Sequence, residues 1–180
     1  MQKLFLAMCL TLLAVTVSAQ EKPPANYENW GVCPFECCTY RDWTANDEVP
    51  VHSQRDDKSP VTFSVQRGEQ VEGLTGVVVT EKPGVLKINR TVDDGFIKGS
   101  HAPQLKLHAG DVVYLLTPLG EGYYLFWYQG KTYISGESLR TMPRDDAQEN
   151  VINWWKLVRN SKGAMGWTRA EKFDHIDACG

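Results

Sequence analysis

Short β-strand signals separated by turn residues occupy most of this chain, and they restrict its possible folds more than any other feature. Residues 61–65 alternate between apolar and polar side chains, and residues 71–80 are rich in β-branched residues and interrupted by glycines. Runs of this kind, bounded by Gly, Pro, Asp and Asn, are typical of strands, and many of them at regular spacing are typical of sandwiches and small barrels. The sequence therefore predicts an all-β fold.

The predicted strands follow one another closely along the chain. They span residues 48–52, 61–65, 71–80, 85–88, 104–107, 112–117, 123–128, 131–134, 153–159 and 166–168. Helical signals are confined to two short stretches, Arg144–Glu149 and Thr168–Phe173, and Thr168 is a candidate N-cap residue for the second. We therefore expect only short helical turns beside the sheets.

A weak internal repeat indicates that two similar β-units make up this fold. Residues 63–71 and 105–113 both read apolar-x-apolar-x-x-Gly-acid-x-Val. The glycines of the two copies, Gly68 and Gly110, are 42 residues apart, which is close to the length of a small barrel unit. Self-similarity at such a spacing is a sequence signature of repeated structural units.

Four short motifs of this chain resemble the bacterial SH3-like (SH3b) domain family. They are Arg67-Gly68-Glu69, Ala109-Gly110-Asp111, the Trp-x-x-Val run Trp155–Val158 and the Gly-x-x-Gly-Trp-Thr run Gly163–Thr168. The resemblance implies one or two small SH3-like barrels. It also implies that the glycines of the last run permit a tight turn between strands and that Trp167 packs into a barrel.

The resemblance suggests how the chain is divided. Residues 48–100 form a first SH3-like unit, and residues 101–178 form a second unit with an insertion near residues 136–150. The first unit lacks a Trp-led strand and a Gly-Trp ending, so a single elaborated barrel is the alternative. Residues 20–47 are expected to form an extended N-terminal segment that contains cysteines.

The first 19 residues have the three parts of a signal peptide. Lys3 is followed by an apolar run, Leu4–Val15, and then by small residues at Val17-Ser18-Ala19. The apolar run is shorter than the roughly 20 residues that span a bilayer, so we expect cleavage after Ala19 and no membrane span. The mature protein is then periplasmic or secreted.

Four cysteines remain after removal of the signal peptide: Cys33, Cys37, Cys38 and Cys179. An even number of cysteines in an exported chain favours disulfide bonds. A bond between the neighbours Cys37 and Cys38 is strained, so Cys33 pairs with one of them and Cys179 with the other. Zinc binding is the alternative, but the spacing is not that of two CxxC knuckles, and an oxidising compartment disfavours free thiolates.

Composition and motifs argue against several other classes of function. The formal net charge of −3 becomes −4 when Lys3 is removed with the signal peptide, and the chain has no basic cluster of the kind that nucleic-acid binding requires. The four histidines, His52, His101, His108 and His175, lack metal-binding or catalytic spacing and are expected at the surface. We therefore predict a protein that is not an enzyme and has no cofactor or metal site.

Aromatic residues provide the best candidates for a binding surface. In the predicted strand Tyr123–Tyr128, alternate side chains face opposite ways, so one face is core and the other is available for contacts. The candidate ligand-binding residues are Tyr123, Trp127, Tyr133 and Trp154. The sequence thus predicts a non-catalytic extracytoplasmic module that binds a cell-wall peptide or glycan or an envelope protein. The alternative is a structural or assembly protein whose aromatic residues serve packing and oligomerisation.

Overall fold

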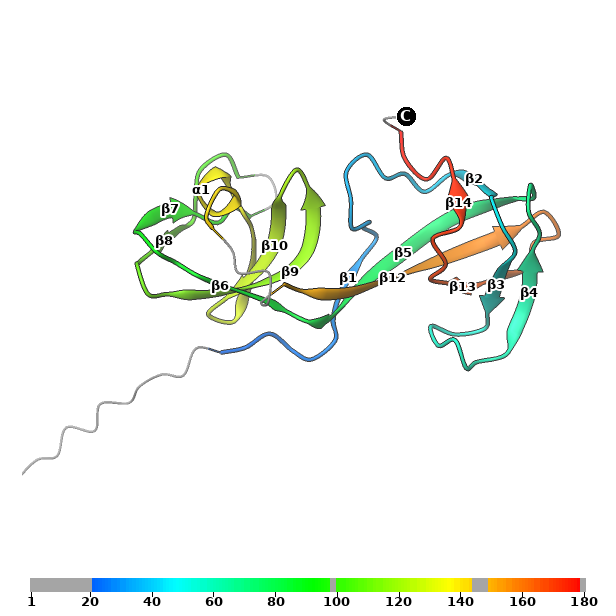
Figure 1. Cartoon of the computed structure of the whole chain (residues 1–180), viewed down its shortest axis with the longest axis horizontal. Coiled ribbons are helices and arrows are strands. Elements are labelled where there is room, and N and C mark those ends of the chain that lie inside the picture. The colour runs from blue at the N-terminus through cyan, green and yellow to red at the C-terminus, as the bar shows by residue number, and fades with distance from the viewer. Residues whose placement is uncertain (1–20, 98–99, 144–148, 179–180) are drawn as a thin grey trace, which may run out of the picture.

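The computed structural model describes residues 21–97, 100–143 and 149–178, so the predicted signal peptide lies outside it. The fold is almost entirely β (Figure 1). In chain order the elements are β1 (Tyr27–Trp30), β2 (Asp42–Ala45), β3 (Val49–His52), β4 (Val61–Val65), β5 (Gln70–Lys82), β6 (Gly84–Lys87), β7 (Val92–Asp94), β8 (Leu105–Leu107), β9 (Val112–Gly120), β10 (Tyr123–Tyr128), β11 (Lys131–Ile134), α1 (Glu137–Arg140), β12 (Val151–Asn160), β13 (Met165–Thr168) and β14 (Phe173–Asp174). The predicted all-β class is confirmed.

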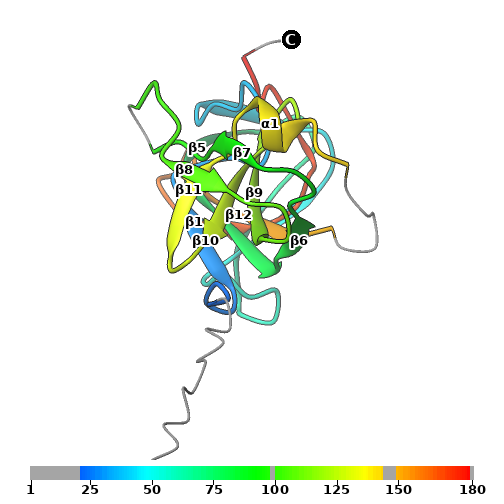
Figure 2. The same ribbon diagram turned by 90° about the vertical axis from the view of Figure 1, so that its left-hand side faces the viewer.

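The strands form two lobes that lie side by side in Figure 1. The large lobe, residues 21–82 and 149–178, is a curled sheet with strand order β14-β2-β5-β12-β13-β3-β4, and β1 also pairs with β5. The small lobe, residues 84–143, holds a four-stranded sheet with order β11-β10-β9-β6, the β7–β8 pair and α1. Figure 2 views the molecule with the small lobe nearest the reader.

The small lobe is inserted between two neighbouring strands of the large lobe. Strands β5 and β12 are antiparallel partners over almost their whole length, from Lys82 opposite Val151 to Val71 opposite Asn160. All residues of the small lobe lie between these two strands in the sequence. The predicted division into units at 48–100 and 101–178 therefore differs from the observed one, because the long β5–β12 ladder joins segments that the prediction had separated.

Each lobe has its own hydrophobic core. The large-lobe core consists of Trp43, Ala45, Val49, Val51, Val65, Val71, Val158 and Phe173. The small-lobe core consists of Leu86, Ile88, Leu107, Val113, Leu115, Phe126, Tyr128, Leu139 and Met142. No residue belongs to both clusters, so each sheet curls around its own set of apolar side chains.

The two copies of the sequence repeat take the same local structure. Gly68 and Gly110 both have positive φ, +85° and +98°, which glycine adopts without steric cost. In the first copy the Glu69 carboxylate accepts a hydrogen bond from the Gln66 N–H at 2.7 Å. In the second copy the Asp111 carboxylate accepts one from the His108 N–H at 2.8 Å. The acidic residue after each glycine thus closes the turn that connects β4 to β5 in the first copy and β8 to β9 in the second.

All ten predicted strands are present, but four others were missed: β1, β2, β7 and β14. Two of these fall in residues 20–47, which were expected to be an extended segment, and both pair with β5. The predicted helix at Thr168–Phe173 is wrong, because β13 ends at Thr168 and β14 begins at Phe173. The other predicted helix, residues 144–149, lies almost entirely outside the described residues.

The disulfide prediction is confirmed in part. Cys33 is bonded to Cys38, one of the two pairings that the sequence left open for Cys33. Cys37 is also disulfide-bonded, while Cys179 lies outside the described residues. The cysteine cluster therefore serves as a covalent staple near the start of the large lobe.

The Gly-x-x-Gly-Trp motif forms the predicted turn but places its tryptophan outside the core. Gly163 has φ +82° and donates its N–H to the Asn160 carbonyl at 3.0 Å in the β12–β13 hairpin. Trp167 is only half-buried and lies against Trp30, with ring centroids 6.0 Å apart. The expectation that Trp167 packs into a barrel interior is therefore wrong.

Candidate functional site

A groove between the two lobes forms an apolar concavity with a volume of about 620 Å³. It is lined by Asn29, Trp30, Val32, Phe96, Ile97, Leu119, Leu125, Thr132, Tyr133 and Ile134. We call this feature the inter-lobe groove. Two of its lining residues, Trp30 and Ile97, are large apolar side chains that are each 51% exposed. Exposed apolar side chains beside a concavity are a common mark of an interaction site.

The large-lobe wall of the groove carries a stacked cation. The Arg55 guanidinium lies 4.9 Å from the centroid of the Trp30 ring and 5.7 Å from that of Trp167. Glu28 forms an ion pair with Arg55 at 2.8 Å and accepts the Trp30 indole N–H at 2.9 Å. These contacts hold the exposed Trp30 ring in one orientation, which lowers the entropy that a ligand contact would cost.

The small-lobe wall follows from the alternation of side chains along β10. Phe126 and Tyr128 are buried in the small-lobe core, and Leu125 faces the groove. On the partner strand β11, Thr132 and Ile134 also line the groove. The prediction that one face of Tyr123–Tyr128 is core is confirmed, and of the two alternatives for the other face, solvent or a neighbouring unit, Leu125 borders the groove between the lobes.

The outer edge of β11 borders this groove and is only partly paired among the described residues. Ile134 exchanges both of its outward backbone hydrogen bonds with Phe96, at 2.8 and 2.7 Å. Outward and inward backbone groups alternate along an antiparallel strand, so the N–H and C=O of Thr132 point outward as well. Within the described part of the chain, no backbone group pairs with Thr132 on this side.

Strand β1 presents a similar edge on the opposite wall. The Gly31 N–H donates to the Gly76 carbonyl at 2.8 Å, so Gly31 and Gly76 form a hydrogen-bonded pair next to the β1–β5 ladder. The backbone groups of Trp30, which lies opposite Val77, therefore point away from β5. Among the described residues, the groove thus combines two outward-facing backbone edges with exposed apolar side chains.

Of the four residues predicted to bind ligand, Tyr133 is the one that lines the inter-lobe groove. Its ring stacks on Phe126 of the small-lobe core with centroids 5.7 Å apart, so it serves packing as well. Trp127 lies on the same sheet as the groove but packs edge-on against Tyr27 at 6.3 Å. The Trp127 indole N–H donates to the Glu21 carbonyl at 2.9 Å, so the N-terminal segment already bonds the polar group of this side chain.

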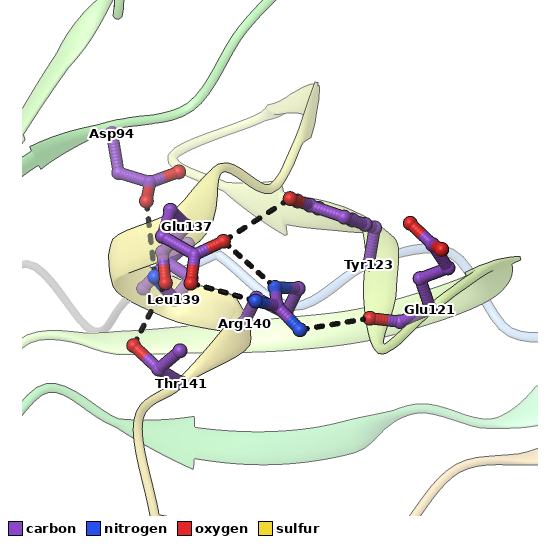
Figure 3. Close-up of polar contacts among 7 residues, drawn as sticks. All are labelled: Asp94, Glu121, Tyr123, Glu137, Leu139, Arg140 and Thr141. Carbon is purple, nitrogen blue, oxygen red and sulfur yellow. Dashed lines mark hydrogen bonds and ion pairs between the residues drawn. The ribbon is translucent and has the colours of Figure 1, made fainter.

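Tyr123 lies at the other end of β10 and contacts α1 (Figure 3). Its hydroxyl donates to the Glu137 carboxylate at 3.2 Å, and the Arg140 guanidinium lies 5.3 Å from its ring centroid. Hydrogen bonds from Arg140 lower the pKa of the exposed Glu137 carboxyl, and the Tyr123 hydroxyl adds to this effect. Arg140 also donates to the Glu121 carbonyl at 3.4 Å. This network anchors the helix to the sheet.

Trp154 lies in the large lobe and does not reach the groove. Its ring contacts Phe35, Tyr40 and Trp43 with centroids 5.5 to 6.3 Å apart. The four predicted residues therefore occupy four different environments, and the structure does not bring them together into one surface.

Nine of the ten groove residues were not among the sequence candidates, and three of these nine, Trp30, Ile97 and Thr132, matter most for the site. Trp30 was missed because residues 20–47 carried no strand prediction. A signal for Ile97 was available, since Phe96-Ile97 is an apolar pair beside glycine and charged residues. Thr132 contributes its backbone, which no pattern of side chains reveals.

The described residues contain no cluster of three or more His, Cys, Asp or Glu side chains that could hold a metal ion. One histidine differs from expectation, because His52 is buried and its Nδ1 lies 2.9 Å from the Ser59 carbonyl oxygen. His52 therefore contacts a local turn and does not lie at the surface. In the same part of the chain, no helix is long and apolar enough to cross a membrane.

Comparison with protein-family models, with curated proteins and with solved structures finds no match. The functional argument therefore depends on the residues and geometry of this chain.

Proposed function

We propose that this protein is a non-catalytic extracytoplasmic binding module that holds an extended segment of a partner protein in the inter-lobe groove. The observation that supports this most directly is the outward-facing backbone of Thr132 beside the exposed Trp30 and Ile97 side chains. An added strand forms main-chain hydrogen bonds to such an edge, and neighbouring pockets select its alternate side chains. The Cys33–Cys38 disulfide supports an oxidising location.

The chemistry of the groove favours a protein segment over the other ligands that the sequence left open. Most of its lining side chains are apolar, and Asn29 and Thr132 are the polar exceptions. A glycan chain requires many hydrogen-bonding side chains, and a charged cell-wall peptide requires ionic partners within the groove. An extended protein segment with apolar residues at alternate positions satisfies both the apolar walls and the open backbone edges.

The proposal is tested with the synthetic peptide acetyl-Thr-Val-Thr-Val-Thr-amide. Amide hydrogen exchange, followed by NMR, reports on the Thr132 N–H directly. We expect the peptide to slow exchange at Thr132 by at least about tenfold, because the N–H becomes hydrogen-bonded and excluded from water. The same peptide with alternate N-methylated residues lacks the required donors and should have no effect.

Two variants provide the side-chain control. Trp30→Ala removes an exposed wall of the groove and should weaken peptide binding by about tenfold. Met165→Ala removes an equally exposed apolar side chain, 54% accessible, that does not line the groove, and it should leave binding unchanged. Equal effects of the two substitutions, or unchanged exchange at Thr132, would contradict the proposal. Co-sedimentation with purified peptidoglycan that Trp30→Ala does not weaken would identify a wall ligand instead.

The structural role that the sequence left as an alternative also has an observation in its favour. Trp127, Tyr133 and Trp154 each contact aromatic residues of the same chain, the first and last edge-on and Tyr133 by stacking. These contacts stabilise the lobes and the region between them. Light scattering after size-exclusion chromatography separates the two functions, since an assembly protein forms a defined oligomer in the absence of any peptide.

A further inference from the structure

A second cavity lies in the large lobe and shares no lining residue with the inter-lobe groove. Its volume is about 320 Å³, near the lower limit of the roughly 300–1,000 Å³ that small-molecule sites occupy. It is lined by Pro34, Phe35, Trp154, Lys156, Ala170, Glu171, Phe173 and Ile176. We call it the Lys156 pocket, because this lysine is its one buried charged residue.

The strand alternation of β12 turns Lys156 inward. Trp154, Lys156 and Val158 share one face of the strand, and Val158 belongs to the large-lobe core. Lys156 is only 1% exposed. Its Nζ has no hydrogen-bond partner among the described residues and lies 4.1 Å from the centroid of the Trp154 ring. The ring face attracts the ammonium, but it does not accept a conventional hydrogen bond.

The charge of Lys156 lacks a close counterion within the described residues. Burial lowers the pKa of its amine from 10.5 to about 8, and the negative charge of Glu171 opposes this shift only in part. The amine is therefore still mostly protonated at pH 7. Glu171 itself is exposed. A buried ammonium without a paired carboxylate is costly for the folded protein, and an anion that entered the pocket would relieve that cost.

The apolar walls of the pocket are fixed in place by the fold. Pro34 and Phe35 lie within the short loop that the Cys33–Cys38 disulfide closes, and Phe35 meets Trp154 edge-on with centroids 5.5 Å apart. On the other side, Phe173 belongs to β14, which pairs with β2. The walls are thus pre-organised, which reduces the entropy lost when a ligand binds.

We propose that the Lys156 pocket binds an organic monocarboxylate, whose carboxylate pairs with the Lys156 ammonium and whose apolar part contacts the aromatic walls. One cation with no neighbouring donors matches a single negative charge, whereas a phosphate group needs several donors. Cationic ligands are repelled by the ammonium. Sugars are disfavoured because Lys156 and the exposed Glu171 are the charged side chains of a lining that is otherwise apolar or aromatic, which leaves few groups to bond their hydroxyls. The carboxylate belongs either to a small free acid or to the C-terminus of a peptide.

The test uses the oxidised chain with 3-phenylpropionate and its neutral amide, 3-phenylpropionamide, in paired calorimetric titrations at pH 7. We expect the acid to bind at least about tenfold more tightly than the amide, because only the acid forms an ion pair with Lys156. N-Acetyl-Gly-Phe with a free carboxylate, compared with its C-terminal amide, tests the peptide source in the same way. Preference for the free acid alone or for the peptide alone identifies the source of the carboxylate.

Substitution and titration provide the controls. Lys156→Met, which keeps a long apolar side chain, should abolish the preference for the acid, whereas Lys162→Met, at an exposed lysine of the β12–β13 turn, should retain it. NMR titration of the Lys156 ε-methylene in the wild-type chain gives a readout that does not depend on any variant: bound 3-phenylpropionate should raise the pKa of the amine by at least about one unit. Equal binding of acid and amide in both pairs, or a pKa of Lys156 that neither carboxylate ligand raises, would overturn the proposal.

Discussion

Asp94 in the small lobe and Lys156 in the large lobe are both 1% exposed, yet their surroundings are opposite. The Asp94 carboxyl oxygens accept the N–H groups of Gly95 and Gly136 at 2.6 Å and of Leu139 at 3.0 Å. Figure 3 shows the last of these bonds where α1 meets β7. Lys156 has an aromatic ring beside it and no hydrogen-bond partner among the described residues.

The difference shows how two buried polar groups serve different purposes. Asp94 satisfies backbone donors of α1 and of the segment that precedes it, so it holds the helix against the sheet. Lys156 donates no hydrogen bond to the described residues, and burial of an unpaired ammonium is unfavourable for folding. A buried polar group that is fully bonded is part of the scaffold, whereas one that stays unpaired in a cavity is available for a ligand.

The largest loss of stability is expected when the fully hydrogen-bonded Asp94 carboxylate is removed. Asp94→Ala would leave three N–H groups without an acceptor, so we expect the free energy of unfolding to fall by about 4 kcal/mol. Urea denaturation followed by tryptophan fluorescence measures this. Asp93→Ala, at the exposed neighbour, should change stability by no more than about 0.5 kcal/mol. Similar losses for the two variants would show that the Asp94 bonds contribute little.

Replacement of Lys156 should change the free energy of unfolding in the opposite direction. The lowering of the Lys156 pKa from 10.5 to about 8 corresponds to a cost of about 3 kcal/mol in the folded state at pH 7. Lys156→Met removes this cost and fills the same space, so we expect the free energy of unfolding to rise by about 3 kcal/mol in the same assay. A decrease would mean that the ammonium is stabilised by contacts other than those described.

The same pKa predicts a pH dependence that belongs to the large lobe. Between pH 8 and 10.5 the unfolded chain retains the Lys156 proton and the folded chain loses it, so wild-type stability rises with pH across this window. Tyrosine ionisation acts in the opposite direction near its upper end, since burial raises the pKa of Tyr128 to about 12. The difference in the free energy of unfolding between Lys156→Met and wild type reports the contribution of the lysine alone. This difference should shrink by about 1 kcal/mol between pH 8 and 9. A constant difference would indicate an amine whose pKa is not lowered.

Local sequence patterns predicted much of the fold because short strands and tight turns depend on neighbouring residues. The alternation in Val61–Val65 and the Gly-acid turns after Gly68 and Gly110 are examples, and both turns use the acidic side chain in the same way. Strands β1 and β2 were missed because Tyr27–Trp30 and Asp42–Ala45 contain almost no β-branched residues. They become strands only by pairing with β5.

The candidate sites were less accessible to sequence reasoning. Trp154 was predicted as a candidate ligand-binding residue, but its neighbour in space, Lys156, was not. A signal was present, since Lys156 lies two residues after Trp154 and two before Val158 on an alternating strand. A charged residue at an inward position was thus predictable, whereas the cavity around it depends on Phe35 and Phe173, which lie far apart in the chain.

The sequence by itself determined the all-β class, ten of the strands, the paired Gly-acid turns and the disulfide-bonded cysteine cluster, because each depends on residues that are close together along the chain. Only the tertiary structure decided that the small lobe is inserted between β5 and β12, that Trp30 and Thr132 face one groove, and that the Lys156 charge is left unpaired. These features depend on pairings between residues dozens of positions apart, and the packing of the whole chain selects them.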